Sequence, residues 1–287
     1  MKLLRVGHAG AEVPAVLIDD DHVLDLSSVV SDFDPAFFAG DGPADLQAAV
    51  VSKGYSLPQI SLQSARVGSC IARPGQILGI GLNYSDHAAE AGADVPGEPI
   101  VFSKSPHCIS GPYDDLLLPP GADKVDWEVE LGVVIGRRAS RVASVAEALN
   151  YVAGYCVVND VSERAWQMER GGQWLKGKSA DTFAPVGPWL VTPDEVSNPQ
   201  SLELFLDVNA EPMQRGRTEK MIFSTAHIVW YLSQFLTLHP GDLIATGTPA
   251  GVGLGKRPPR YLADGDLVEL GVSGLGAQRQ RCRRATL

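Results

Sequence analysis

The chain has 287 residues, of which 45% are hydrophobic and 20% charged, values typical of a globular protein with one large domain or one large and one small domain. Its formal net charge of −10 argues against non-specific binding to nucleic acid or an anionic membrane, so local cations would have to hold an anionic substrate. The sequence has no run apolar enough for a signal peptide or membrane span, and its four cysteines form no C-x-x-C pair. These features predict a cytoplasmic protein without a zinc knuckle or a disulfide framework.

Residues 1–70 are predicted to form a small N-terminal domain, separated by Arg73-Pro74-Gly75 from the rest. Nothing in this segment suggests chemistry, because its histidines are isolated. Strands are expected at Leu3–Val6, Val13–Ile18 and His22–Leu26, and short helices at 36–38 and 45–53.

A predicted strand, Gln76–Gly81, leads into a polar segment that contains His87 and Glu90. The glycine spacing there fits neither a dinucleotide-binding loop nor a P-loop. If Ser85 or Asp86 caps a helix, His87 and Glu90 lie three residues apart on one helical face. A carboxylate beside an imidazole orients it and raises its basicity, as a general base requires. An ordinary surface ion pair is the alternative.

The stretch from Val125 to Ile135 is rich in β-branched residues and is predicted to be one strand. Glu128 and Glu130 are two residues apart, so their side chains leave the same face of that strand. Two neighbouring carboxylates repel each other, and a buried strand would keep them only with a cation between them, for which a hard divalent ion is suited. The alternative is an edge strand whose glutamates face water.

Asp160 follows another predicted strand, residues 152–158, and is expected to begin a helix. Arg164 and Gln167 would then follow at i+4 and i+7, stacked on one face near Asp160. This arrangement suits a third metal ligand with two groups that bind oxygen atoms. An N-cap with an intrahelical ion pair is the alternative reading.

The remaining segments carry weaker signals. Residues 173–183 are dense in polar groups and are expected to form an ordered loop, in which one lysine could stabilise developing negative charge or simply face solvent. Residues 223–237 have the apolar spacing of an amphipathic helix, and strands are expected at 202–208, 242–246 and 267–272. The glycine-rich loop 247–253 could bind a carboxylate through N–H groups and the Thr248 hydroxyl, or be a tight turn. The Arg-rich tail, 279–284, is expected to be solvated.

Taken together, residues 75–280 resemble the fumarylacetoacetate hydrolase family. The resemblance implies a mainly β, α+β catalytic domain with a mixed β-roll, spanning 75–287, after a small N-terminal α/β domain spanning 1–70. Five motifs carry it: G-x-N-Y-x-x-H-x-x-E at 81–90, D-W-E-V-E-L-G at 126–132, N-D-V-S-E-R-x-x-Q at 159–167, K-G-K-S-x-D-T-F at 176–183 and T-G-T-P-x-G-V-G at 246–253.

The resemblance also implies site roles, a cofactor and an assembly. Mg²⁺, or alternatively Mn²⁺, would be the cofactor, and the protein would be a homodimer or a higher homo-oligomer with a small-molecule 2-oxo acid as its substrate. The implied metal ligands are Glu128, Glu130 and Asp160; the water-activating dyad on a lid is His87 and Glu90; Lys178 contacts the substrate oxygens; Tyr84, Arg164, Gln167 and Thr248 bind the substrate.

The implied reaction is hydrolysis of the C3–C4 bond of a 2,4-dioxo acid to pyruvate and a second acid. Segments 110–115 and 157–174 look most like the bacterial 2,4-didehydro-3-deoxy-L-rhamnonate and 2,4-diketo-3-deoxy-L-fuconate hydrolases, whose products are pyruvate and L-lactate. Alternatives are an oxaloacetate decarboxylase, a 2-hydroxyhepta-2,4-diene-1,7-dioate isomerase and a ureidoglycolate lyase-type activity. A non-catalytic 2-oxo acid binding protein is a third possibility from another class.

Overall fold

The computed structural model of the protein describes residues 1–40, 42–53, 56–90 and 92–286. Within these ranges, no helix combines the length and apolar character needed to cross a membrane. The helices are short, and strands build most of the ordered structure. The helices are α1 (Pro35–Ala39), α2 (Gly42–Lys53), α3 (Ser85–Glu90), α4 (Arg164–Met168), α5 (Leu175–Lys178) and α6 (Thr225–Phe235), with 3₁₀ turns η2 (Pro106–Cys108), η3 (Val145–Tyr151), η4 (Pro193–Glu195), η5 (Thr218–Lys220) and η6 (Gly253–Gly255).

A large mixed sheet forms the centre of the molecule. Its middle strands are rich in Val, and the residues of the strand 129–135 are all buried, because both faces of the sheet are covered there. In order, the sheet contains β4 (Gln59–Ser61), β3 (His22–Asp25), β2 (Val13–Leu17), β1 (Lys2–Val6), β13 (Ala184–Val191), β11 (Val152–Asn159), β10 (Val129–Ile135), β16 (Leu243–Ala245), β5 (Ile77–Gly81) and β6 (Ile100–Lys104), and β7 (Ile109–Ser110) also pairs with β13.

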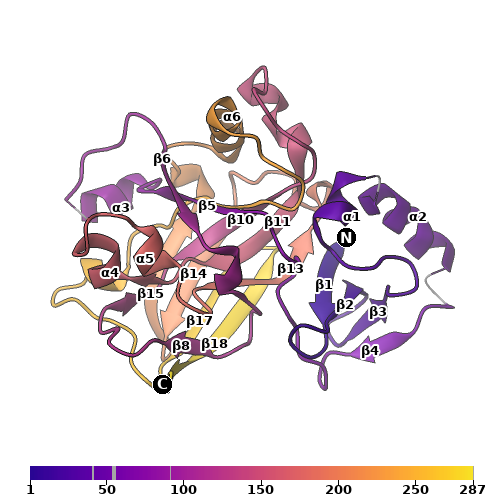
Figure 1. Ribbon diagram of the computed structural model, residues 1–287, viewed down its shortest axis with the longest axis horizontal. Coiled ribbons are helices and arrows are strands. Elements are labelled where there is room, and N and C mark those ends of the chain that lie inside the picture. Colours follow the sequence, from indigo (N-terminus) through magenta and orange to yellow (C-terminus); the bar gives the residue numbers. More distant parts are fainter. Residues whose placement is uncertain (41, 54–55, 91, 287) are drawn as a thin grey trace.

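The N-terminal strands belong to this same sheet. Figure 1 shows them, in indigo, as a lobe in which β1 lies beside β13. Lys2 and Leu3 pair antiparallel with Val191 and Leu190, so backbone hydrogen bonding continues from one lobe into the other. The division into domains 1–70 and 75–287 stays a prediction, with Leu287 outside the described residues.

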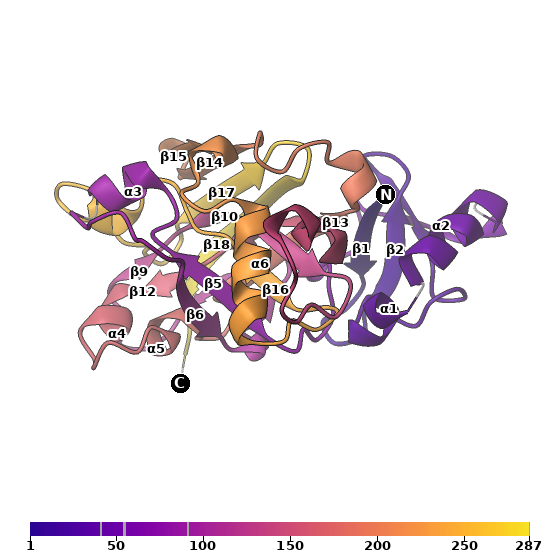
Figure 2. The same cartoon turned by 90° about the horizontal axis from the view of Figure 1, so that it is seen from above.

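A second sheet packs on the first and closes the roll. It contacts β10, β11 and β13 on one side, whereas α6 lies on the other side of the large sheet, near β10 and β16 (Figure 2). The predicted sheet-dominated α+β fold is therefore confirmed. The second sheet runs β15 (Glu211–Arg217), β14 (Glu203–Val208), β17 (Leu267–Val272), β18 (Gly276–Arg284) and β8 (Leu116–Leu118), and a separate pair is β9 (Val125–Asp126) with β12 (Ser162–Glu163).

Two local expectations around the acidic residues were wrong. The stretch 125–135 is not one strand, because β9 pairs with β12 whereas β10 pairs with β11, and the chain changes partner at Trp127 and Glu128. The helix expected from Asp160 begins instead at Arg164, where Glu163 caps it by accepting a hydrogen bond from the Trp166 amide.

Two more corrections concern the later segments. The expected loop at 173–183 contains the short helix α5. The predicted solvated tail is strand β18, in which the arginines are exposed but Gln278, Gln280 and Cys282 are buried. Hydropathy did not indicate this strand because two of its buried residues are amides; Gln278 Nε2 donates to the carbonyls of Val157, Pro185 and Gly187.

Candidate functional site

Strand register brings the three predicted metal ligands together. In the antiparallel pair β10–β11, Val129 lies opposite Asn159, so the start of one strand meets the end of the other. The Asp160 amide donates to the Glu128 carbonyl at 2.9 Å. As a result, carboxylate oxygens of Glu128, Glu130 and Asp160 lie within 4.8 Å of one another, and all three residues are buried.

The end of β16 reaches the same place, because it is antiparallel to β10. The Gly247 amide donates to Glu130 Oε2 at 2.7 Å, and the Thr248 hydroxyl donates to the Val129 carbonyl at 2.9 Å. Gly247 has a φ of +101°, and a Cβ there would stand 2.6 Å from the Cβ of Asn83. Only glycine fits this approach, so the glycine-rich loop is a structural contact to the acidic cluster.

Two buried lysines neutralise part of this cluster. Lys178 Nζ lies 2.8 Å from Glu128 Oε2 and 2.6 Å from Asp160 Oδ2, and Lys104 Nζ lies 2.5 Å from Asp160 Oδ1. Sequence reasoning missed Lys104. The available signal was the alternation along 100–104, in which Ile100, Phe102 and Lys104 share one face of a mostly apolar strand.

Arg164 forms a third positive contact. Its Nε donates to Asp126 Oδ2 at 2.8 Å, and its Nη1 donates to Gln167 Oε1 at 3.1 Å. Its Nη2 pairs with Glu128 Oε1 at 2.7 Å, and since this nitrogen carries two hydrogens, it keeps donor capacity for a ligand. No role was predicted from the sequence for Asp126, which is fully buried and accepts a hydrogen bond from the Gly253 amide at 2.7 Å. Asp126 therefore connects Arg164 to the loop after β16.

The donor set fits a hard divalent cation. Burial, and then the charges of Asp160 and Glu128, raise the pKa of Glu130 well above its usual range. Among the described residues, no charged side chain donates a hydrogen bond to Glu130; its recorded donor is the Gly247 amide. Carboxylate oxygens are the ligands that Mg²⁺ and Mn²⁺ prefer, and a cation among them would relieve this repulsion.

Of the predicted dyad, His87 lines a cavity with Glu128 and Glu130, and Glu90 holds it from behind. His87 Nδ1 lies 3.3 Å from Glu90 Oε2, and the Gly251 amide donates to both Glu90 oxygens, at 3.0 and 3.1 Å. Burial alone would raise the pKa of Glu90, but hydrogen bonds from His87 and Gly251 outweigh it and lower the pKa. Glu90 therefore orients the imidazole and attaches α3 to the glycine-rich loop.

A cavity of about 210 Å³ joins these groups. Of the predicted residues, Tyr84, Glu90 and Asp160 lie outside its lining. The buried Tyr84 hydroxyl has no hydrogen-bond partner among the described residues, and burial and then the charge of Glu130 raise its pKa. The predicted roles themselves stay predictions. The cavity is lined by Ile80, Gly81, Leu82, His87, Ala93, Phe102, Glu128, Glu130, Arg164, Gln167, Met168, Trp174, Lys178, Thr248 and Leu254.

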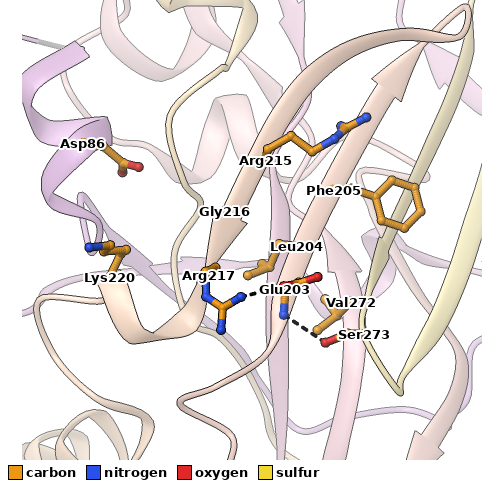
Figure 3. A pocket seen from close by; sticks show the side chains of 10 residues that line it. All are labelled: Asp86, Glu203, Leu204, Phe205, Arg215, Gly216, Arg217, Lys220, Val272 and Ser273. Carbon is orange, nitrogen blue, oxygen red and sulfur yellow. Dashed lines mark hydrogen bonds and ion pairs between the residues drawn. The ribbon is translucent and has the colours of Figure 1, made fainter.

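A wider hollow of about 690 Å³ lies elsewhere, over β14 and β15. Figure 3 shows its residues, with Asp86 projecting from α3 nearby. Its guanidinium groups are engaged on the protein surface, since Arg217 Nη1 lies 2.5 Å from Glu203 Oε1 and Arg215 Nη2 lies 2.6 Å from Asp207 Oδ1. The buried carboxylates of Glu128 and Glu130 line the smaller cavity instead.

Comparison with known proteins places these residues in a family context. The model of the fumarylacetoacetate (FAA) hydrolase C-terminal family matches residues 76–283. A relative from Burkholderia multivorans, named "Putative hydrolase", is 54% identical over 286 residues, covering 99% of this chain and 100% of the relative.

Solved structures of other proteins match the fold of this chain over its whole length. A 2-hydroxyhepta-2,4-diene-1,7-dioate isomerase from Mycobacterium marinum is 31% identical with a TM-score of 0.77, and both chains are fully covered. A maleylpyruvate hydrolase from Sphingobium sp. SYK-6, in complex with manganese(II) and pyruvate, is 27% identical with a TM-score of 0.82, again with both chains fully covered.

Proposed function

Because the chain belongs to the fumarylacetoacetate hydrolase family, we propose that it is a metal-dependent hydrolase that cleaves the C3–C4 bond of a 2,4-dioxo acid. The observation that carries this proposal is that His87, which Glu90 holds at 3.3 Å, lines the same cavity as the buried carboxylates of Glu128 and Glu130. The buried carboxylates, with a divalent cation, suit the binding of a 2-oxo acid, and His87 with Glu90 suits the activation of water. The manganese and pyruvate in the Sphingobium hydrolase support this reading.

The carboxylate end of the substrate would lie among the cations of the cavity. Arg164 Nη2 has donor capacity, and none of the described residues accepts from the Gln167 amide nitrogen. Both groups therefore suit a substrate carboxylate. Glu128, Glu130 and Asp160 would hold Mg²⁺ or Mn²⁺, which when bound supplies Lewis acidity to the carboxylate and 2-oxo oxygens of the substrate.

The dyad would activate the water. Since His87 Nδ1 faces Glu90, its Nε2 is the nitrogen that takes a proton from water as the oxygen attacks C4. The C3–C4 bond then breaks, and its electron pair passes into the C2 carbonyl to give the enolate of pyruvate. The Lys178 ammonium stabilises the enolate oxygen, and protonation at C3 yields pyruvate. The products are pyruvate and a second carboxylic acid, with one water consumed.

Decarboxylation or isomerisation is the second candidate. Both need the same 2-oxo acid end of the site but no attacking water, and the Mycobacterium marinum neighbour is named as an isomerase. The two candidates differ in what they require of His87. Hydrolysis should depend on it, whereas oxaloacetate decarboxylation should survive its loss.

The test is a pyruvate-release assay with Mg²⁺ or Mn²⁺ on 2,4-dioxopentanoate, on the 2,4-didehydro-3-deoxy-L-rhamnonate predicted from the sequence, and on oxaloacetate. We expect hydrolysis that is lost with EDTA and in Glu128→Gln, and that falls by about 10²-fold or more in His87→Ala. The matched control is His22→Ala, because His22 Nδ1 lies 3.0 Å from Asp19 in the same i, i+3 arrangement on the surface. Activity on oxaloacetate alone, indifferent to His87→Ala, would establish the decarboxylase instead.

A further inference from the structure

The charged groups of the cavity are concentrated around the acidic cluster. Among the described residues of its lining, the cationic side chains are Arg164 and Lys178, and both pair with Glu128. The Thr248 hydroxyl is engaged as well, since it donates to Val129 and accepts from Gln214. These groups can serve the 2-oxo acid end of a substrate, but they leave no separate cation for a second carboxylate.

Apart from Glu128, Glu130, His87 and Gln167, which the proposed reaction uses, the rest of the lining is apolar. The Trp174 and Phe102 rings lie 5.3 Å apart between centroids, and Trp174 packs so closely over Gly81 that a Cβ there would stand 2.7 Å from the indole. Met168 and Leu254 remain 58% and 37% exposed, which places them toward the mouth of the cavity. An apolar ligand group that covers these two side chains gains affinity, about fourfold for each methylene buried.

Leu82 is a further, independent indication that an apolar side chain is needed on this wall of the cavity, which is formed by Leu82, Phe102, Met168, Trp174 and Leu254. It has a φ of +52°, a left-handed conformation that Gly or Asn adopts more readily and that is rare for a bulky residue. Its backbone would tolerate a polar Asn better than Leu, yet a leucine side chain borders the cavity there. Backbone strain of this kind persists where a side chain is needed at one place.

We propose that the group beyond C4 of the substrate is uncharged and apolar, an alkyl or aryl chain. This inference rests on the proposed hydrolysis of a 2,4-dioxo acid. A hydroxyl beyond C4 that lies against Leu82, Met168 and Leu254 would lose its water without finding a partner on these side chains, which lowers affinity about tenfold. A carboxylate at that position would lose still more, because Arg164 and Lys178, the Lys and Arg side chains among the described lining residues, serve the 2-oxo acid end of the substrate.

A matched substrate series tests the proposal. The rhamnonate derivative is the 5-hydroxy analogue of 2,4-dioxohexanoate, since its second product is lactate, so the two differ by a single hydroxyl. We expect kcat/KM to rise about fourfold per methylene from 2,4-dioxopentanoate to 2,4-dioxoheptanoate. The 5-hydroxy analogue should be about tenfold poorer than 2,4-dioxohexanoate, and 2,4-dioxoheptanedioate at least tenfold poorer than 2,4-dioxoheptanoate.

Two variants assign the preference to this wall. Leu82→Asn keeps a residue that tolerates the left-handed backbone, and Met168→Gln changes an exposed side chain of similar length. Each should lower the ratio of kcat/KM for 2,4-dioxoheptanoate to kcat/KM for 2,4-dioxopentanoate about fivefold. Val51→Gln is the control, because Val51 is 79% exposed on α2.

The outcomes separate the two proposals. Hydrolysis that favours the hydroxylated or dicarboxylate substrate, or variants that leave the chain-length series unchanged, would overturn this inference and leave the hydrolase intact. If no member of the series releases pyruvate, the proposed function falls and this inference falls with it.

Discussion

Replacing Lys104 with methionine tests how strongly the buried charges depend on one another. The Lys104 and Asp160 side chains are both 0% exposed and lie 2.5 Å apart. Removing one partner of a buried pair costs about 3–5 kcal/mol, because the other charge is left in a low-dielectric interior. Asp160 keeps Lys178 at 2.6 Å, so we expect the lower end, about 3 kcal/mol. Methionine has a similar length, so little of this loss reflects a cavity.

The assay is urea unfolding followed by tryptophan fluorescence, in EDTA so that no cation replaces the missing charge. With an m-value of about 3 kcal/mol/M, the loss moves the midpoint down by about 1 M urea. Lys124→Met is the matched control, because Lys124 pairs with Glu169 at 2.5 Å but the two side chains are 40% and 58% exposed. Solvent screens that exposed pair, so its loss should leave the midpoint nearly unchanged. Equal midpoint shifts in the two variants would refute the reasoning.

Three further variants probe other contacts. Burial alone would raise the pKa of Glu12, but hydrogen bonding to Arg66 lowers it below 4.5. Glu12→Gln should therefore lower the free energy of unfolding at pH 7, as measured by urea titration. The difference from the wild-type free energy should shrink as the pH falls below about 4.5, because the wild-type carboxylate then becomes protonated. Gly251→Ala should lower the free energy of unfolding by about 2 kcal/mol or more and should weaken hydrolysis, because φ is +107° and a Cβ would stand 2.0 Å from the Met213 carbonyl oxygen. A variant with the melting temperature and the hydrolysis rate of the wild type would contradict this prediction. Thr248→Val should cost about 1–3 kcal/mol by leaving buried partners unpaired, whereas Thr248→Ser should be near wild type by the same unfolding measurement.

Much of the local chemistry could be predicted from spacing. The two-residue separation of Glu128 and Glu130 predicted carboxylates on one face, and they do lie together. The three-residue separation of His87 and Glu90 predicted a pair on one helical face, and α3 holds it at 3.3 Å. The helical pair depends on the period of one element alone, so a correct element type was enough. Glu128 precedes β10, so its position beside Glu130 also depends on the hydrogen bond that its carbonyl accepts from the Asp160 amide.

Contacts between distant segments were not predictable in this way. Lys104 is 56 positions from Asp160 in the chain, and its approach depends on how β6 lies beside α5 and the end of β11. Asp126 was taken as an ordinary position of a single strand, yet it binds Arg164 because the chain changes strand partner just after it. A lysine or aspartate in a sequence is usually solvated, and only its neighbours in space decide otherwise.

By itself, the sequence determined the acidic, globular character of the chain, its sheet-rich fold class and the functional side chains that lie close together because they are near in sequence. The tertiary structure alone decided that His87, Glu128 and Glu130 line a common cavity. The reason is strand direction: β10 begins where β11 and β16 end, because it is antiparallel to both, and β5, parallel to β16, ends there too. Local periodicity carries no information about which strands become neighbours, and that choice assembled the carboxylates, the lysines and the apolar wall.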